Sequence, residues 1–185
     1  MDAFKFFDPR DPDTGWLSNF YRAEFRLDGL TWPTVEHAYQ AAKFTDATHA
    51  EAISFAKTSR AAKSLSQSRQ HAIQTDFEAQ KRAAMLRLVA AKFCLGANTS
   101  LMARLLKTKG SLLIEASPAD NHWGVGADGQ GSNHLGRILL AVRGVFLHCD
   151  KGNMQMENLG DASTLHVRVV GEAGTLLKDA QWNHA

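Results

Sequence analysis

The sequence predicts a compact, predominantly helical single domain of the α+β class, with a small antiparallel hairpin. Its 185 residues, 20.3 kDa in mass, are enough for one domain with a hydrophobic core but too few for two. Several segments repeat apolar residues at helical spacing, and only short segments alternate as strands do. A hydrophobic content of 44% and a charged content of 22% are ordinary for a globular protein.

The composition argues against several functional classes. No apolar run approaches the ~20 residues of a membrane span, and the first residues lack a signal-peptide pattern, so we expect a cytoplasmic protein without membrane partners. Cys94 and Cys149 are far apart and form no Cys-x-x-Cys motif, and the eight histidines show no ligand spacing. We therefore predict no metal and no cofactor. A net charge of +2 and a pI near 8.6 suit an anionic small molecule better than a dedicated nucleic-acid surface.

The N-terminal region predicts strands. Residues 4–7 read as a short buried strand, and residues 23–27 alternate with Ala23, Phe25 and Leu27 on one face. Asp28-Gly29 is a strong signal for a two-residue hairpin turn, and residues 30–32 form the return strand. Residues 15–21 form an aromatic-rich loop around Asn19, which is either a packed lid or a surface for a nucleobase or ribose.

A helix should follow the hairpin, with Pro33 at its first position and Thr31 or Thr34 as its cap. Glu36 then lies in the first turn, where the helix dipole favours its charged form. A polar stripe formed by Glu36, Gln40 and Lys43 lies beside an apolar one. Taken alone, Glu36 and Lys43 are either solvated helix charges or part of a functional face.

Further helices are predicted over residues 51–63, 76–95, 98–107 and 135–146. The first overlaps a stretch without acidic residues, 52–75, whose basic side chains form either a solvated face or a rim for phosphate: Lys57, Arg60, Lys63 and Arg69. The second should end at Gly96, and the last should be capped by Ser132 or Asn133.

The chemically richest segment is the polar loop of residues 117–133, which follows a short strand at 112–116 and contains Asp120, Trp123 and four glycines. A glycine-rich loop before a helix suits phosphate. Its Gly124, Gly126 and Gly129 match the G-x-G-x-x-G spacing of dinucleotide-binding folds. We reject that interpretation, because a polar loop precedes the motif and no strand-helix-strand unit surrounds it.

Beyond residue 149 the character changes. We predict a domain over residues 1–149 and a C-terminal appendage over residues 150–185, in which residues 164–170 alternate as an edge strand or the segment trails loosely.

Three polar clusters together resemble the YbiA/NADAR family: residues 18–20, residues 32–44, and the segment Glu115-Ala116-Ser117-Pro118-Ala119-Asp120 with Trp123-Gly124 and 131–136. The resemblance covers roughly residues 4–147 and includes Ala91-Lys92-Phe93. It implies a YbiA-like α+β fold without metal and the activity of an N-glycosidase. The chain departs from the family pattern at residues 62–67, where many members have Leu-Gly-Arg after Ala-Lys, and at Phe77, where a tryptophan is common.

The resemblance also implies site residues. Glu36 and Asp120 would be the catalytic carboxylates, one aiding water attack and one protonating the leaving group, in either order. We expect both to face one pocket. Substrate would be bound by a wider set: Asn19, Phe20, Lys43, Trp123, Gly124, Gly126 and Asn133.

Three functions follow from the resemblance and the basic stretch. The first is hydrolysis of a small phosphorylated ribosyl amine, such as an early intermediate of riboflavin biosynthesis. The second is removal of ADP-ribose from guanine in nucleic acid, which would make nucleic acid the modified substrate. The third is a catalytically silent ADP-ribose- or nucleotide-binding module. The sequence predicts no oligomeric state.

Overall fold

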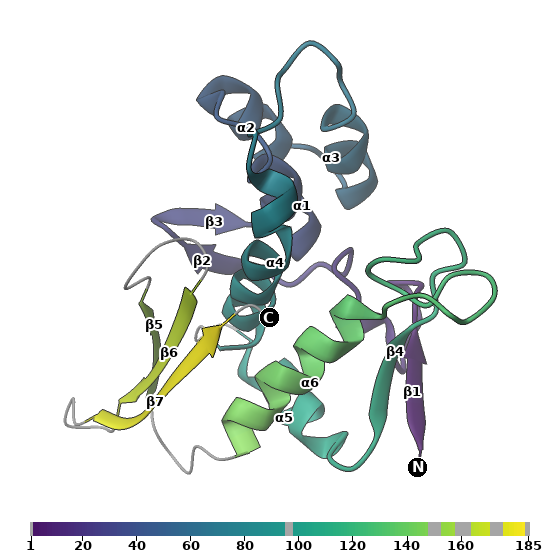
Figure 1. Ribbon diagram of the computed structural model, residues 1–185, viewed down its shortest axis with the longest axis vertical. Helices are drawn as coiled ribbons and strands as arrows, with labels where there is room; N and C mark the ends of the chain where they lie inside the picture. Colours follow the sequence, from purple (N-terminus) through teal and green to yellow (C-terminus); the bar gives the residue numbers. More distant parts are fainter. Residues whose placement is uncertain (1, 95–97, 148–152, 158–163, 171–175, 184–185) are drawn as a thin grey trace.

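The computed structural model describes residues 2–94, 98–147, 153–157, 164–170 and 176–183 (Figure 1). In the N-terminal half the elements are β1 (Ala3–Phe6), a 3-10 helix η1 (Gly15–Leu17), β2 (Phe25–Leu27), β3 (Leu30–Trp32), α1 (Val35–Ala41), α2 (Ala47–Ser54), α3 (Ser59–Leu65) and α4 (Phe77–Cys94). Then come α5 (Thr99–Lys107), β4 (Leu112–Glu115), α6 (His134–Leu147), β5 (Asn153–Glu157), β6 (Thr164–Val170) and β7 (Leu176–Asn183). The α+β class, mostly helical with little sheet, is confirmed.

The predicted hairpin is confirmed as the antiparallel pair β2–β3, in which Phe25 lies opposite Trp32. Asp28 and Gly29 both have positive φ, 54° and 78°, which is the backbone of a primed two-residue turn. Arg87 of α4 fixes the turn with a two-pronged ion pair to the Asp28 carboxylate.

The first strand differs from its prediction in burial and in partner. Only Phe6 of β1 is buried, while Ala3, Phe4 and Lys5 are exposed. The strand pairs in parallel with β4, so that Phe6 lies opposite Glu115. A two-stranded sheet at the edge of the domain packs one face on the core and leaves the other exposed, which explains why the apolar run is not fully buried.

Helix α4 runs through the middle of the fold (Figure 1) and contacts both α1 and α6. The apolar positions predicted for this helix are buried, among them Phe77, Leu86, Val89 and Phe93. Its predicted end at Gly96 lies outside the described residues. Arg143 of α6 is buried and donates to the Thr108 carbonyl oxygen (2.5 Å) and to Thr108 Oγ1 (2.8 Å), so it joins α6 to the turn after α5.

The single helix predicted over residues 51–63 is wrong, because the chain forms two helices there, α2 and α3. Thr58 interrupts the pattern with extended backbone, and its Oγ1 accepts a hydrogen bond from Ala61 N (3.1 Å), as an N-cap does. Lys57 therefore precedes α3, and the basic residues do not share one helical face.

The C-terminal strands form a three-stranded antiparallel sheet in the order β5-β6-β7. Among the described residues these strands pair only with one another and not with β1–β4 or β2–β3. The strand predicted at residues 164–170 is β6, with a strand on either side. In the part of the chain described, no helix is both long and apolar enough to cross a bilayer.

Candidate functional site

Glu36 lies in the first turn of α1 and is only 5% exposed. Thr34 caps the helix, since its Oγ1 accepts a hydrogen bond from His37 N (3.3 Å). Pro33 lies one residue before this cap, so its predicted place at the first helical position is wrong. Every residue of α1 is buried. Glu36 is therefore not a solvated surface charge.

Two side chains orient the Glu36 carboxylate. Gln40, one turn further along α1, donates from Nε2 to Glu36 Oε1 at 2.7 Å. Ser66, which ends α3, donates from Oγ to Gln40 Oε1 at 2.5 Å. Gln40 thus presents its amino group to Glu36 and its oxygen to Ser66, whose hydroxyl also lies 2.8 Å from Lys63 O. The carboxylate is thus held in a fixed orientation inside the protein.

Burial raises the pKa of Glu36, while the Gln40 hydrogen bond and the charges of Lys63 and Lys43 lower it and the charge of Asp120 raises it. The expectation that the helix end keeps Glu36 in its charged form is thus too simple, because desolvation is the largest effect. Burial likewise lowers the pKa of Lys43, and the charge of Glu36 opposes that. Cations and carboxylates here interact in one partly desolvated space.

Asp120 begins the loop that closes the site. Its Oδ1 accepts backbone hydrogen bonds from His122 N (2.9 Å) and Trp123 N (2.7 Å), an arrangement that fixes the start of the loop. Trp123 meets Tyr39 of α1 edge to face, with ring centroids 5.6 Å apart, and Tyr39 packs on Phe77 at 5.5 Å. Two aromatic rings in contact, Tyr39 of α1 and Trp123 of the Asp120 loop, therefore lie near Glu36.

The glycine loop is folded back on β4 and on itself. Val125 N donates to Glu115 O (2.9 Å), and Asn133 N donates to Gly124 O (3.0 Å). Side chains on Gly124 or Gly126 would collide with neighbouring atoms, Glu115 O for the first and Asn121 Oδ1 for the second. These two glycines allow close packing of the loop, which is a structural reason for their presence.

Asn133 uses its whole amide on β4: Oδ1 accepts from Glu115 N (3.0 Å), and Nδ2 donates to Leu113 O (2.9 Å). Its φ of 50° is left-handed, which asparagine tolerates better than most residues. The Asn133 side chain therefore joins the end of the loop to β4.

Asn19 and Phe20 lie beside the start of α1, because Asn19 O accepts a hydrogen bond from Glu36 N (3.1 Å). The Asn19 side chain is 7% exposed and donates from Nδ2 to Met85 Sδ (3.2 Å). The Lys63 ammonium lies 5.7 Å from the Phe20 ring centroid. Phe20 is thus at the site edge, and Asn19 is directed into the core.

Lys92 of α4 holds the segment of residues 16–18, which precedes Asn19. It is buried and donates to Trp16 O (2.7 Å) and Ser18 O (2.9 Å). Burial lowers the pKa of Lys92 to about 7.

Glu115, at the end of β4, is a further acid that interacts electrostatically with Glu36 and Asp120, and the site residues predicted from the sequence do not include it. Burial, together with the charges of Asp120 and Glu36, raises its pKa to about 8, and the charge of Lys63 opposes this rise. In the sequence, Glu115 opens the Glu115–Asp120 motif. The apolar run Leu112-Leu113-Ile114 before it, however, indicates the end of a buried strand. Lys63 is distinguished in the sequence only as a member of the basic stretch.

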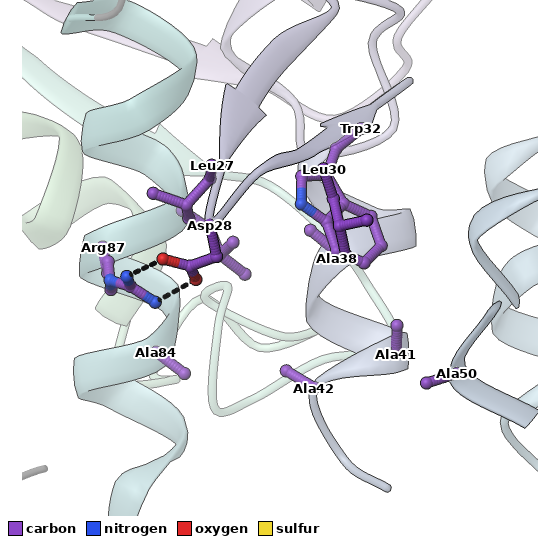
Figure 2. A pocket seen from close by; sticks show the side chains of 11 residues that line it. Leu27, Asp28, Leu30, Trp32, Ala38, Ala41, Ala42, Ala50, Ala84 and Arg87 are labelled. Carbon is purple, nitrogen blue, oxygen red and sulfur yellow. Dashed lines mark hydrogen bonds and ion pairs between the residues drawn. The ribbon is translucent and has the colours of Figure 1, made fainter. Parts of the chain in front are cut away.

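A separate cavity of about 290 Å³ lies on the other side of α1 (Figure 2). Its lining is apolar apart from the Asp28–Arg87 pair, and includes Ala38, Ala41 and Ala42 of α1. Helical spacing puts these alanines on the face of α1 opposite Glu36 and Gln40. The cavity holds none of the predicted site residues. Among the residues the structure describes, no three histidine, cysteine or acidic side chains are grouped so as to hold a metal ion.

Comparison with known proteins identifies the family. The NADAR domain matches residues 5–146. N-glycosidase YbiA of Escherichia coli (strain K12) is 35% identical over 131 residues, which cover 71% of this chain and 81% of that protein. The NMR structure of E. coli YbiA superposes with a TM-score of 0.71 at 34% identity, covering 79% of this chain and 85% of the other.

Two longer relatives carry names from riboflavin biosynthesis. The chloroplastic protein PYRR of Zea mays is 40% identical over 148 residues, and protein VVA0006 of Vibrio vulnificus (strain YJ016) is 39% identical over 138 residues. The matches cover 72% and 75% of this chain but only 23% and 37% of those proteins. The family match spans most of the chain, as does the YbiA match. The chain therefore belongs to the NADAR domain family, as its sequence motifs predict.

Proposed function

We propose that the chain is an N-glycosidase that hydrolyses the bond between a ribose carbon and the nitrogen of an amine or nucleobase. The observation that carries this proposal is the buried Glu36 carboxylate, oriented by Gln40 and set among Lys43, Lys63 and Asp120. Relatives that this chain covers over most of their length are named N-glycosidase, which supports the same reaction.

The chemistry fits these residues. Breaking the bond builds positive charge on the sugar, and a carboxylate held nearby stabilises that charge. Glu36 also accepts a proton from the attacking water. The nitrogen leaves more easily once it is protonated, and the sequence-based hypothesis assigns this proton to Asp120, with the two roles exchangeable.

The favoured substrate is a small ribosyl amine that carries a phosphate. Lys43 and Lys63 are the cations whose charges lower the pKa of Glu36, and Trp123 with Tyr39 offers flat surfaces for a ring. The names of the maize and Vibrio relatives point to riboflavin biosynthesis, so an early intermediate of that pathway is the first compound to test.

A second candidate substrate is guanine in nucleic acid that carries ADP-ribose. The exposed side chains of Lys57, Arg60 and Arg69 favour it, since they extend positive charge outward from Lys63. A catalytically silent binding module is the third candidate.

One paired assay separates the three. The chain is offered a ribosylamine 5-phosphate pathway intermediate and, separately, a guanine-ADP-ribosylated oligonucleotide, and released ribose 5-phosphate or ADP-ribose is measured. We expect turnover of the first. Turnover of the second alone, with affinity that falls steeply as salt rises, would favour the nucleic-acid function. Binding of either compound without product would contradict the enzyme and favour the silent module.

A further inference from the structure

Glu115 is a half-buried acid whose side chain takes part in none of the described hydrogen bonds. Its Oε2 is inaccessible to solvent and has no hydrogen-bond partner among the described residues. Its backbone, by contrast, is fully engaged, since Glu115 N donates to Asn133 Oδ1 and Glu115 O accepts from Val125 N. An ionised carboxylate in that position would be costly, whereas a protonated one is tolerated.

The charged groups that act on Glu115 are those of the site. They come from three directions: Asp120 from the loop, Glu36 from α1 and Lys63 from α3. Two of the three are negative, and burial acts in the same sense, so the pKa of Glu115 rises to about 8. Glu115 is therefore protonated at neutral pH and close to two carboxylates.

The other acids beside the loop are less suited to donate a proton. Asp120 Oδ1 accepts two backbone N–H groups, from His122 and Trp123, so this oxygen is engaged in holding the loop. His122 is beside the loop too, but burial and the charge of Lys81 lower its pKa, so it is neutral where Glu115 still carries its proton.

We propose that Glu115 is the general acid of this site and that Asp120 instead holds Trp123 in place. The assignment rests on the proposed N-glycosidase function. In the reaction the C–N bond breaks, its electron pair goes to nitrogen, and the Glu115 carboxyl proton goes to the same nitrogen. Water adds to the sugar carbon and gives its proton to Glu36, and transfer of that proton back to Glu115 restores the starting state.

The test compares Glu115→Gln with the wild-type chain on the ribosylamine 5-phosphate substrate, with Glu51→Gln on the exposed face of α2 as control. The amide introduced by Glu115→Gln keeps the shape of the side chain but has no acidic proton. We expect kcat to fall about 100-fold or more with KM nearly unchanged. In the wild type, kcat should decline above about pH 8, as Glu115 ionises. The residual activity of Glu115→Gln should lack that decline.

The variant should fold, because a neutral side chain is what the buried position favours, and thermal unfolding at pH 7 checks it. Wild-type kcat and an unchanged pH profile in Glu115→Gln would overturn the assignment. So would loss of the alkaline decline in His122→Asn or Asp120→Asn instead. A wild-type chain that turns over neither substrate contradicts the proposed function itself, which is a different outcome from turnover that survives the loss of Glu115.

Discussion

Gln40 Nε2 lies 2.7 Å from Glu36 Oε1, and both side chains are buried in the first two turns of α1. The bond joins residues four apart, the spacing at which helix side chains meet. Ser66 Oγ completes the arrangement from α3 by donating to Gln40 Oε1. A carboxylate that is buried and held in this way is ready to act without first reorganising.

Replacing Glu36 by Gln should abolish turnover while leaving ligand binding intact. The amide has nearly the same shape, but it cannot take a proton from water or stabilise positive charge on the sugar. We expect kcat to fall at least about 100-fold. Product release measures turnover, and calorimetric titration with ribose 5-phosphate measures binding. Glu51→Gln serves as the surface control, and full activity in Glu36→Gln would refute the role of this residue.

Replacing Ser66 by Ala should have a smaller effect with a distinct pH signature. Without Ser66 Oγ, the Gln40 amide is free to turn its oxygen toward Glu36. The Gln40 hydrogen bond lowers the pKa of Glu36, so its loss raises that pKa. The acidic limb of the kcat profile should therefore move to higher pH, with a loss of about 3- to 10-fold at neutral pH, the worth of one hydrogen bond. Ser64→Ala, on the exposed side of α3, is the matched control. An unshifted acidic limb would show that Gln40 needs no anchor.

Local signals were sufficient for the parts of the fold that nearby residues determine. Asp28-Gly29 predicts its turn because the turn needs positive φ at both positions. The periodicity of α4 predicts its buried face because one helix stripe meets the core. The same logic failed at Thr58, where a capping hydroxyl outweighed a continuous helical pattern.

Long-range contacts decided what the sequence could not supply. The parallel pairing of β1 with β4 joins residues more than a hundred positions apart, and no local pattern encodes it. Glu115 owes its burial to that pair and to the loop packed on it. The pKa of Glu36 likewise depends on its burial and on groups from α3 and the Asp120 loop, which the position at the helix end does not reveal.

Lys92 should make the stability of the protein depend on pH in the alkaline range. Its pKa is about 7 in the folded chain and near the ordinary value of 10.5 when unfolded. Between these values the unfolded chain binds more protons, so the free energy of unfolding rises with pH, by up to about 1.4 kcal/mol per pH unit. Lys92→Met should lose this rise. Urea unfolding at pH 7, 8 and 9 measures it, with the exposed Lys109→Met as control. Parallel curves for Lys92→Met and wild type would contradict the burial of an ionisable amine.

Gly126→Ala should destabilise the loop more than Gly129→Ala. Both glycines have positive φ, 70° and 74°, so both substitutions strain the backbone by about 1 kcal/mol. A methyl group on Gly126 would also meet Asn121 Oδ1, whereas one on Gly129 meets open space. We expect a lower melting temperature and lower activity for Gly126→Ala, and a small loss of stability alone for Gly129→Ala. Equal effects would mean that the Asn121 contact relaxes freely.

Asn133→Ala should lower stability and not substrate affinity. The variant loses the hydrogen bonds to Glu115 N and Leu113 O, each worth about 1 kcal/mol, and it places alanine at a φ of 50°. Asn133→Gly loses the same hydrogen bonds, but glycine adopts this φ without strain. The difference in melting temperature between the two variants therefore measures the backbone strain. Their melting temperatures should fall by the same amount with and without saturating ribose 5-phosphate, and KM should stay near the wild-type value. A raised KM with an unchanged melting temperature would instead return Asn133 to the substrate contacts, because a side chain that binds ligand affects the complex and not the free protein.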